Sequence, residues 1–99
     1  MVLIYIYLEE GFIHEFVEIF VNNKKYYQNN NVTTKAVLGL ADTAKIEIAE
    51  NSANIKFFFK NKKLSKIIPI NVSDSVHIAI SLTEHNIVYR VSEHPFEYM

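Results

Sequence analysis

The chain has 99 residues, no cysteine and a formal net charge of −1. At this length we expect one domain, residues 1–99, built around a single hydrophobic core. The missing cysteines exclude a disulfide framework, a thiolate metal site and a thiol nucleophile. With 49% hydrophobic and 21% charged residues, the composition is that of a folded globular protein rather than a disordered one.

Residue types that favour β-strands dominate the sequence. Ile, Val, Phe, Tyr and Thr supply 39 of the 99 residues, whereas Gly and Pro number two each. Side chains that are β-branched or aromatic fit the pleated, half-buried surface of a sheet. The ten Asn residues are the candidates for the turns, because Asn tolerates left-handed backbone conformations.

The first predicted strand is Val2–Leu8, a run of seven apolar residues. No Lys or Arg precedes it, and the acidic residues Glu9 and Glu10 follow, with Gly11 suited to a turn. The run is too short for a membrane-spanning helix, which needs about 20 apolar residues, and it lacks the basic start of a secretory signal. We therefore expect a cytoplasmic protein without a membrane partner.

Residues 12–22 fit two periodicities. Apolar residues recur there at helical spacing, but β-branched and aromatic types fill most of the segment and no N-cap residue precedes it. We therefore favour a strand and keep a helix at 12–22 as the alternative. As a strand, the segment would bury one face: Ile13, Val17, Ile19 and Val21, interrupted by Glu15. Asn22 and Asn23 would then supply a tight turn into residues 24–28.

The segment that follows is less regular. Three consecutive Asn residues at 29–31 predict a loop. Residues 33–42 contain apolar side chains but are broken by Gly39, and they fit either a helical turn or an irregular connection.

Alternation of apolar and polar residues is clearest in the second half of the chain. Because Pro69 has no N–H to donate, it places its strand at the edge of a sheet or near a strand start. On the most regular strand, His77 and Ala79 are expected to face outward. The predicted strands here are 44–48, 55–60, 64–72, 76–83 and 87–92.

Seven or eight short strands, with turn signals about every 8–12 residues, are typical of an all-β fold. We predict an antiparallel β-sandwich of the immunoglobulin-like or another Greek-key type. An α+β fold with the helix at 12–22 is the alternative.

No pattern of catalytic residues is present. The chain has no Gly-x-Ser-x-Gly elbow, no Gly-rich phosphate loop and no His-x-His or His-Glu-x-x-His pattern. We therefore assign no catalytic residue, cofactor or metal site. A small histidine-based enzyme, with or without a metal ion, remains an alternative, with His77 on a strand and His85 in a turn as its candidates.

Positive charge is concentrated in the middle of the chain. Residues 24–66 contain nine Lys against three acids, and Lys56, Lys60 and Lys63 flank a run of three Phe at 57–59. Basic residues between aromatics are typical of proteins that bind single-stranded nucleic acid, which is our second alternative. Lysines beside an apolar strand also protect it from edge pairing, and Lys lacks the fork of Arg, so nucleic acid is not our first choice of partner.

Aromatic residues give the main functional hypothesis. Thirteen Phe and Tyr must be placed in a small sandwich, and several occupy positions expected to face away from the core. Exposed aromatics that form a patch indicate an interface. The tail, residues 93–99, either folds over its own sandwich or docks on a partner. We therefore predict a binding module that associates with itself or with another protein. The interface candidates are Tyr5, Tyr7, Tyr26, Tyr27, Phe58, Phe96 and Tyr98.

Overall fold

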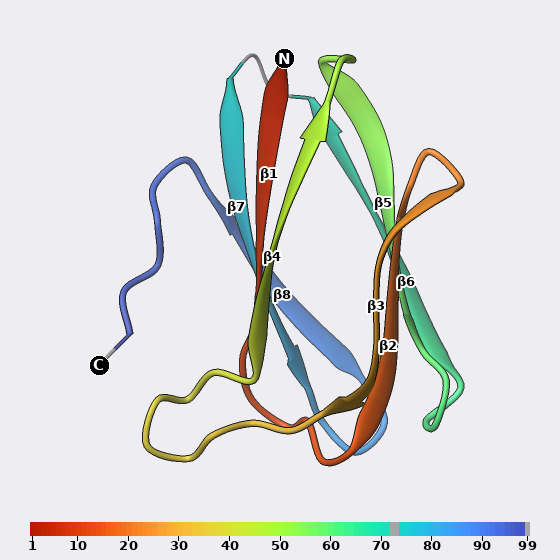
Figure 1. The fold of residues 1–99 in the computed structure, drawn as a ribbon, viewed down its shortest axis with the longest axis vertical. Coiled ribbons are helices and arrows are strands. Elements are labelled where there is room, and N and C mark those ends of the chain that lie inside the picture. The colour runs from red at the N-terminus through yellow and green to blue at the C-terminus, as the bar shows by residue number, and fades with distance from the viewer. Residues whose placement is uncertain (72–73, 99) are drawn as a thin grey trace.

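The computed structural model describes residues 1–71 and 74–98, and these residues contain eight β-strands and no helix (Figure 1). The predicted all-β fold is therefore confirmed. The expected strand end at Val72, the loop start at Ser73 and the tail residue Met99 lie outside the described residues. The strands are β1 Val2–Leu8, β2 Glu15–Val21, β3 Lys24–Val32, β4 Asp42–Ile48, β5 Ser52–Phe59, β6 Leu64–Asn71, β7 Ser75–Leu82 and β8 Ile87–Ser92.

The alternative helix over the second segment is wrong. Side chains of β2 alternate one by one between buried and half-buried along its whole length. Val17 and Ile19 therefore face the core, while Phe16 and Phe20 face outward. Ile13, which we expected on the core-facing side, precedes the strand and is exposed.

Among the described residues, no helix is long and apolar enough to cross a bilayer.

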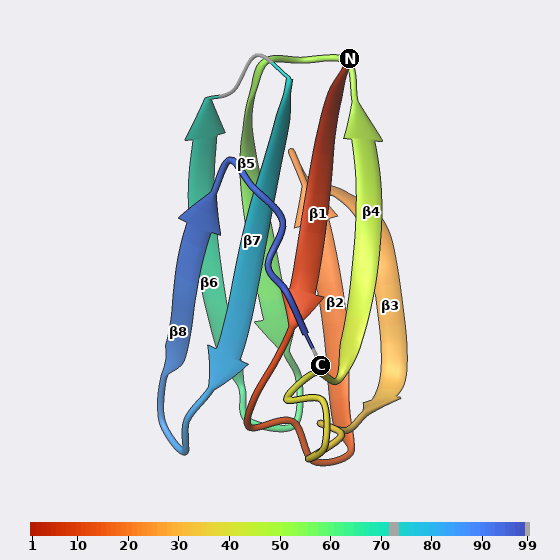
Figure 2. The ribbon, with the colours of Figure 1, turned by 90° about the vertical axis from the view of Figure 1, so that its left-hand side faces the viewer.

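The strands form two four-stranded sheets that pack face to face as a sandwich (Figures 1 and 2). The first sheet has the order β4-β1-β7-β8 and the second has the order β3-β2-β5-β6. Every pairing is antiparallel except that of β1 with β7, which is parallel. Strand β6 lies at a sheet edge, as Pro69 predicted.

The core lies between the sheets and consists of the inward-facing row of each strand. Burying one large aliphatic or aromatic side chain contributes roughly 1.5–3 kcal/mol, so these rows are the main source of stability. The buried rows include Val2, Ile4, Ile6 and Leu8 of β1, Val17, Ile19 and Val21 of β2, Ile55, Phe57 and Phe59 of β5, and Val76, Ile78, Ile80 and Leu82 of β7.

Two turns use the backbone freedom that the sequence indicated. Asn22 and Asn23 join β2 to β3 with φ angles of 49° and 70°, so the predicted Asn turn is confirmed. Gly11 follows β1 with a φ of 86°, and a Cβ atom there would lie 1.9 Å from the carbonyl oxygen of Leu82. Only glycine fits this close approach of two backbone segments.

The predicted loop at residues 29–31 is wrong, because β3 continues through it to Val32. Strand β3 is an edge strand, so Asn side chains can remain solvated on one side while the backbone pairs with β2 on the other. Residues 33–41 form an irregular connection that contains one helical turn, in which the N–H groups of Leu38 and Gly39 donate to the carbonyl oxygen of Lys35 at 3.0 and 2.8 Å, so the segment combines our two expectations. Lys35 and Leu40 make an isolated bridge within it.

A β-bulge in β3 reverses one expected side-chain direction. Ile19 pairs with Tyr27 and the next residue, Phe20, pairs with Lys25, which leaves Tyr26 as an extra residue. Tyr27 therefore shares the side of Ile19 and packs against the core. The expectation that Tyr27 faces away from the core is wrong for this reason.

Candidate interaction surfaces

The tail, residues 93–98, crosses the outer face of the first sheet over β7 and β1 (Figure 2). We call this surface the covered face. The ring of Phe96 meets the ring of Tyr7 edge-on, with centroids 5.3 Å apart. Tyr98 stacks on Tyr7 from another side, at 5.7 Å. Of the two expectations for the tail, the structure shows the contact with its own sandwich.

A buried carboxylate holds the end of the tail. Glu9, just after β1, is 7% exposed and accepts a hydrogen bond from the guanidinium of Arg90 at 2.6 Å. The hydroxyl of Tyr98 donates to the same Glu9 oxygen. Burial and the neighbouring Glu9 carboxylate raise the pKa of Tyr98, so its phenol stays protonated as a donor. Arg90 also lies over the ring of Phe96, 4.4 Å from its centroid.

His77 lies beneath this cover. It faces outward from β7, as predicted, but it is only 6% exposed because aromatic rings surround it. Its ring stacks on Tyr5 at 4.6 Å, with 7° between the planes. Its Nδ1 lies 2.8 Å from the hydroxyl of Tyr7, within hydrogen-bond distance. Burial lowers the pKa of His77, and the nearby His94 lowers it further.

The structure does not bring the two candidate histidines together. His85 lies in the turn between β7 and β8, with its side chain 86% exposed and 3.8 Å from Glu84. His77 is enclosed among aromatic rings. Within the described ranges, no three His, Asp or Glu side chains lie close enough to hold a metal ion.

The outer face of the second sheet has a different character. Phe16, Phe20 and Phe58 face outward from β2 and β5 and are partly exposed. Lys56 is the direct neighbour of Phe20 across the two strands. Lys60 Nζ lies 5.1 Å from the ring centroid of Phe16. We call this set of three Phe and two Lys the Phe/Lys face.

The surroundings of the Phe/Lys face leave it open. Apart from the turns that join its own strands, Figure 1 shows no segment of the described chain outside the second sheet. Ile67, beside Lys56 on β6, is 57% exposed. Glu18, directly opposite Phe58, forms an ion pair with Lys25 at 3.2 Å. The aromatic rings are therefore bordered by lysines, and the one acidic residue among them is already paired.

The remaining candidates do not join either face. Tyr26 is exposed at the bulge, with Lys24 5.2 Å from its ring centroid. The hydroxyl of Tyr27, on β3, donates a hydrogen bond to the carboxylate of Asp42, the first residue of β4. Burial and the Asp42 carboxylate raise the pKa of Tyr27. Lys63 lies in the turn between β5 and β6 with a φ of 53°.

The structure thus divides the seven interface candidates. Tyr5, Tyr7, Phe96 and Tyr98 share the covered face, Phe58 lies on the Phe/Lys face, and Tyr26 and Tyr27 stand apart.

The sequence analysis did not single out four residues of these surfaces, which are Phe16, Phe20, Glu9 and Arg90. For Phe16 and Phe20, the two-residue period of β2 was the available signal. For Glu9 and Arg90, 81 positions apart in sequence, no short pattern exists.

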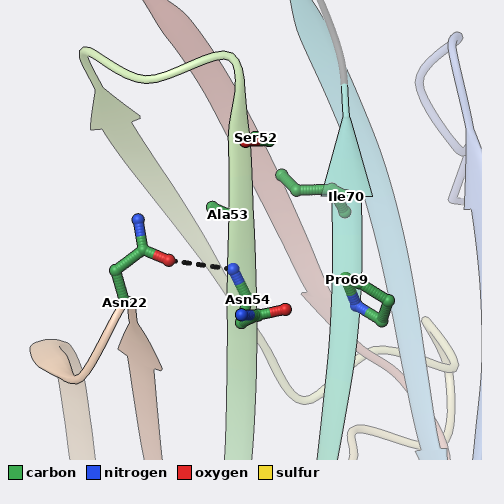
Figure 3. Close-up of a pocket in the computed structure, with 6 residues that line it drawn as sticks. All are labelled: Asn22, Ser52, Ala53, Asn54, Pro69 and Ile70. Carbon is green, nitrogen blue, oxygen red and sulfur yellow. Dashed lines mark hydrogen bonds between the residues drawn. The ribbon is translucent and has the colours of Figure 1, made fainter.

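A small hollow opens near the end of the second sheet, where the turn after β2 meets β5 and β6 (Figure 3). The side-chain oxygen of Asn22 accepts a hydrogen bond from the backbone N–H of Asn54 at 3.0 Å. Pro69 and Ile70 form its other wall. These residues close the β2–β5 ladder, and the hollow carries no charged side chain.

No protein-family model, no curated protein and no solved structure matches this chain.

Proposed function

We propose that the protein is a binding module without chemistry of its own and that the Phe/Lys face is its contact surface for a partner protein. The observation that carries this proposal is the group of three partly exposed Phe side chains on two neighbouring strands of an uncovered sheet. Aromatic side chains are enriched where protein interfaces have their strongest contacts. Covering them removes apolar surface from water, which favours association.

The charges around the rings indicate the partner's chemistry. Lys56 and Lys60 lie beside the aromatic rings, and within the described residues neither forms an ion pair with a carboxylate. A partner surface with apolar side chains at its centre and Asp or Glu at its rim would complement this arrangement.

The kind of cation favours a protein over a nucleic acid. The positive charges of the Phe/Lys face are all lysines. Arg90 is the only arginine in the sequence, and it lies on the other sheet, paired with Glu9. Arginine supplies the forked and stacked contacts that phosphates and bases favour, and the Phe/Lys face lacks them.

A photo-cross-linking experiment tests this surface. We would place a photoreactive phenylalanine at position 58 of the full chain, with position 43 on the first sheet as the matched control. We expect a protein adduct from position 58 and none from position 43. The adduct partner, purified, should bind the wild type and lose at least tenfold in affinity against Phe58→Ser, as expected for a central aromatic contact. Equal labelling from both positions would contradict the proposal, as would unchanged affinity.

Single-stranded nucleic acid is a second candidate because Lys56 and Phe58 follow each other on the outward side of β5 and Lys56 also lies opposite Phe20 of β2. Fluorescence anisotropy with a labelled oligonucleotide at low salt measures it directly. Saturable binding that disappears in Lys56→Glu/Lys60→Glu would favour nucleic acid over a protein partner. A flat signal would remove this candidate.

A further inference from the structure

The four edge strands of the sandwich differ in how they are protected. Strand β3 carries two lysines and a bulge, β4 carries Asp, Lys and Glu, and β6 carries Lys and Pro. Charged side chains, prolines and bulges are the usual means by which proteins prevent edge-to-edge pairing. Strand β8, with the sequence Ile-Val-Tyr-Arg-Val-Ser, has no Lys, acid or Pro.

Strand β8 also exposes apolar side chains on both of its faces. Val88 is 53% exposed, Tyr89 is 41% exposed and Val91 is 49% exposed. Its one charged residue, Arg90, is engaged by Glu9 and Phe96 on the covered face. Among the described residues, β8 pairs with β7 alone, so its other edge is open.

The hairpin geometry shows which backbone groups of β8 are free. At the turn, the N–H of Thr83 donates to the carbonyl oxygen of Asn86 at 2.9 Å, which makes them a hydrogen-bonded pair. Hydrogen-bonded and non-hydrogen-bonded pairs alternate along an antiparallel ladder. Every second residue of β8 therefore points its N–H and C=O groups away from β7: Ile87, Tyr89 and Val91.

We infer that β8 pairs with β8 of a second copy of this chain, antiparallel and around a twofold axis at Tyr89. A twofold axis requires an antiparallel arrangement and places each residue opposite its mirror position about the centre. With Tyr89 opposite Tyr89, Ile87 lies opposite Val91 on the same side of the joined sheet. The free backbone groups of these three residues then meet each other and complete a ladder.

Charge disfavours one of the two neighbouring registers. A shift of the centre by one residue to Arg90 would place Arg90 directly opposite Arg90 of the other copy, and like charges in that position are destabilising. A shift in the other direction, to Val88, would place Val91 opposite position 85, outside the strand, and so shorten the ladder. In the proposed register Arg90 lies opposite Val88 instead. Tyr89 gains an aromatic cross-strand partner, and Lys66, 5.4 Å from its ring centroid, remains beside it.

The contact is small. Two six-residue strands supply less surface than the roughly 1,200–2,000 Å² of a standard stable complex. We therefore expect a monomer–dimer equilibrium that depends on protein concentration. This inference concerns the edge of the first sheet and is independent of the Phe/Lys face, so either can fail without the other.

Sedimentation equilibrium of the full chain, from about 10 μM to about 1 mM, measures this association. The average mass should rise from 11.5 kDa toward twice that value. Val91→Pro should remain at the monomer mass, because proline removes an N–H that points away from β7 and spares the β7–β8 ladder. Ile67→Thr, at an equally exposed apolar position on β6, should associate as the wild type does. A wild-type mass that does not change with concentration would overturn the inference.

Cysteine variants test the register and do not depend on the fold of the proline variant. In the proposed pairing, Tyr89→Cys brings two thiols directly opposite each other, within the Cα separation that a disulfide needs. Val88→Cys, the matched control, places its two thiols on offset positions. We expect Tyr89→Cys to form a disulfide-linked dimer at least tenfold faster than Val88→Cys under mild oxidation. Equal rates, or faster linkage by Arg90→Cys, would overturn the register centred on Tyr89.

Discussion

Both outer faces of the sandwich carry aromatic side chains on alternating strand positions, but only one face is covered. On the covered face, the hydroxyls of Tyr7 and Tyr98 and the Nδ1 atom of His77 have hydrogen-bond partners within the chain. On the Phe/Lys face, the aromatics are phenylalanines, which need no such partners. Tyrosine and histidine side chains thus allow the tail to pack over part of the sheet while these polar atoms keep hydrogen-bond partners.

Chain connectivity decides which face is sealed. The tail leaves β8 at the edge of the first sheet and turns back across that sheet, where Tyr7 receives it (Figure 2). The second sheet ends in hairpins and connections that run to the first sheet, so its outer face stays open. The open aromatics therefore remain available for a partner.

The largest expected contrast comes from one outward aromatic on each face. Tyr7→Ala should lower the free energy of unfolding by about 3 kcal/mol, because it removes packing with two tail rings and leaves His77 without its partner. Phe58→Ala should lower the free energy of unfolding by about 1 kcal/mol, because the outward ring of Phe58 is partly exposed and no tail residue packs on it. Urea denaturation measures both values. Equal losses would show that the tail does not stabilise the covered face.

A smaller difference in unfolding free energy is expected between substitutions of Glu9, beside the covered face, and Glu18, on the outer side of the second sheet. Glu9→Gln should cost about 1–2 kcal/mol, because the buried oxygen that accepts from Arg90 and Tyr98 loses its charge. The matched change Glu18→Gln, in an exposed ion pair with Lys25, should cost less than about 0.5 kcal/mol. Thermal and urea denaturation of both variants provide the comparison, and a larger loss for Glu18→Gln would contradict it.

The smallest effect is a pH dependence that belongs to the covered face. Because burial lowers the pKa of His77, the unfolded chain takes up a proton there near pH 6.5, before the folded chain does. The free energy of unfolding should therefore decrease as the pH falls below about 6.5. The decrease should be smaller than the loss expected for Glu9→Gln.

His77→Gln isolates this contribution from that of the other titrating groups. The variant should show a flatter dependence of unfolding free energy on pH than the wild type between about pH 7.5 and 5.5. His85→Gln, at the exposed turn, serves as the control and should keep the wild-type slope. Identical slopes for all three proteins would show that burial of His77 has no effect on stability.

Local sequence patterns predicted most of the fold. The alternation through β5 and β7, the Asn22–Asn23 turn and the edge position of Pro69 all follow from side-chain period, turn chemistry or the missing N–H. Residues 29–31 were misjudged because Asn disfavours strands on average, whereas an edge strand tolerates it. Tyr27 was misjudged because a one-residue bulge reverses side-chain direction, and no local pattern announced that bulge.

The covered face was harder to predict because its contacts join distant parts of the chain. Glu9 and Arg90 are 81 residues apart, and Tyr7 and His77 are 70 residues apart. Their proximity depends on the parallel pairing of β1 with β7. Neither the aromatic content nor the charge pattern of the sequence predicts that β1 pairs with β7. The Phe/Lys face, by contrast, lies on strands whose alternation can be read directly from the sequence.

The parallel pairing of β1 with β7 also has a consequence for folding kinetics. Strand β1 occupies the middle of its sheet, between β4, about forty residues later in the sequence, and β7, about seventy residues later. The second sheet can assemble from antiparallel neighbours that lie closer in sequence. Chains dominated by such distant contacts fold in milliseconds to seconds rather than microseconds. We therefore expect β2, β3, β5 and β6 to form the early nucleus, with β1 inserted as a late step.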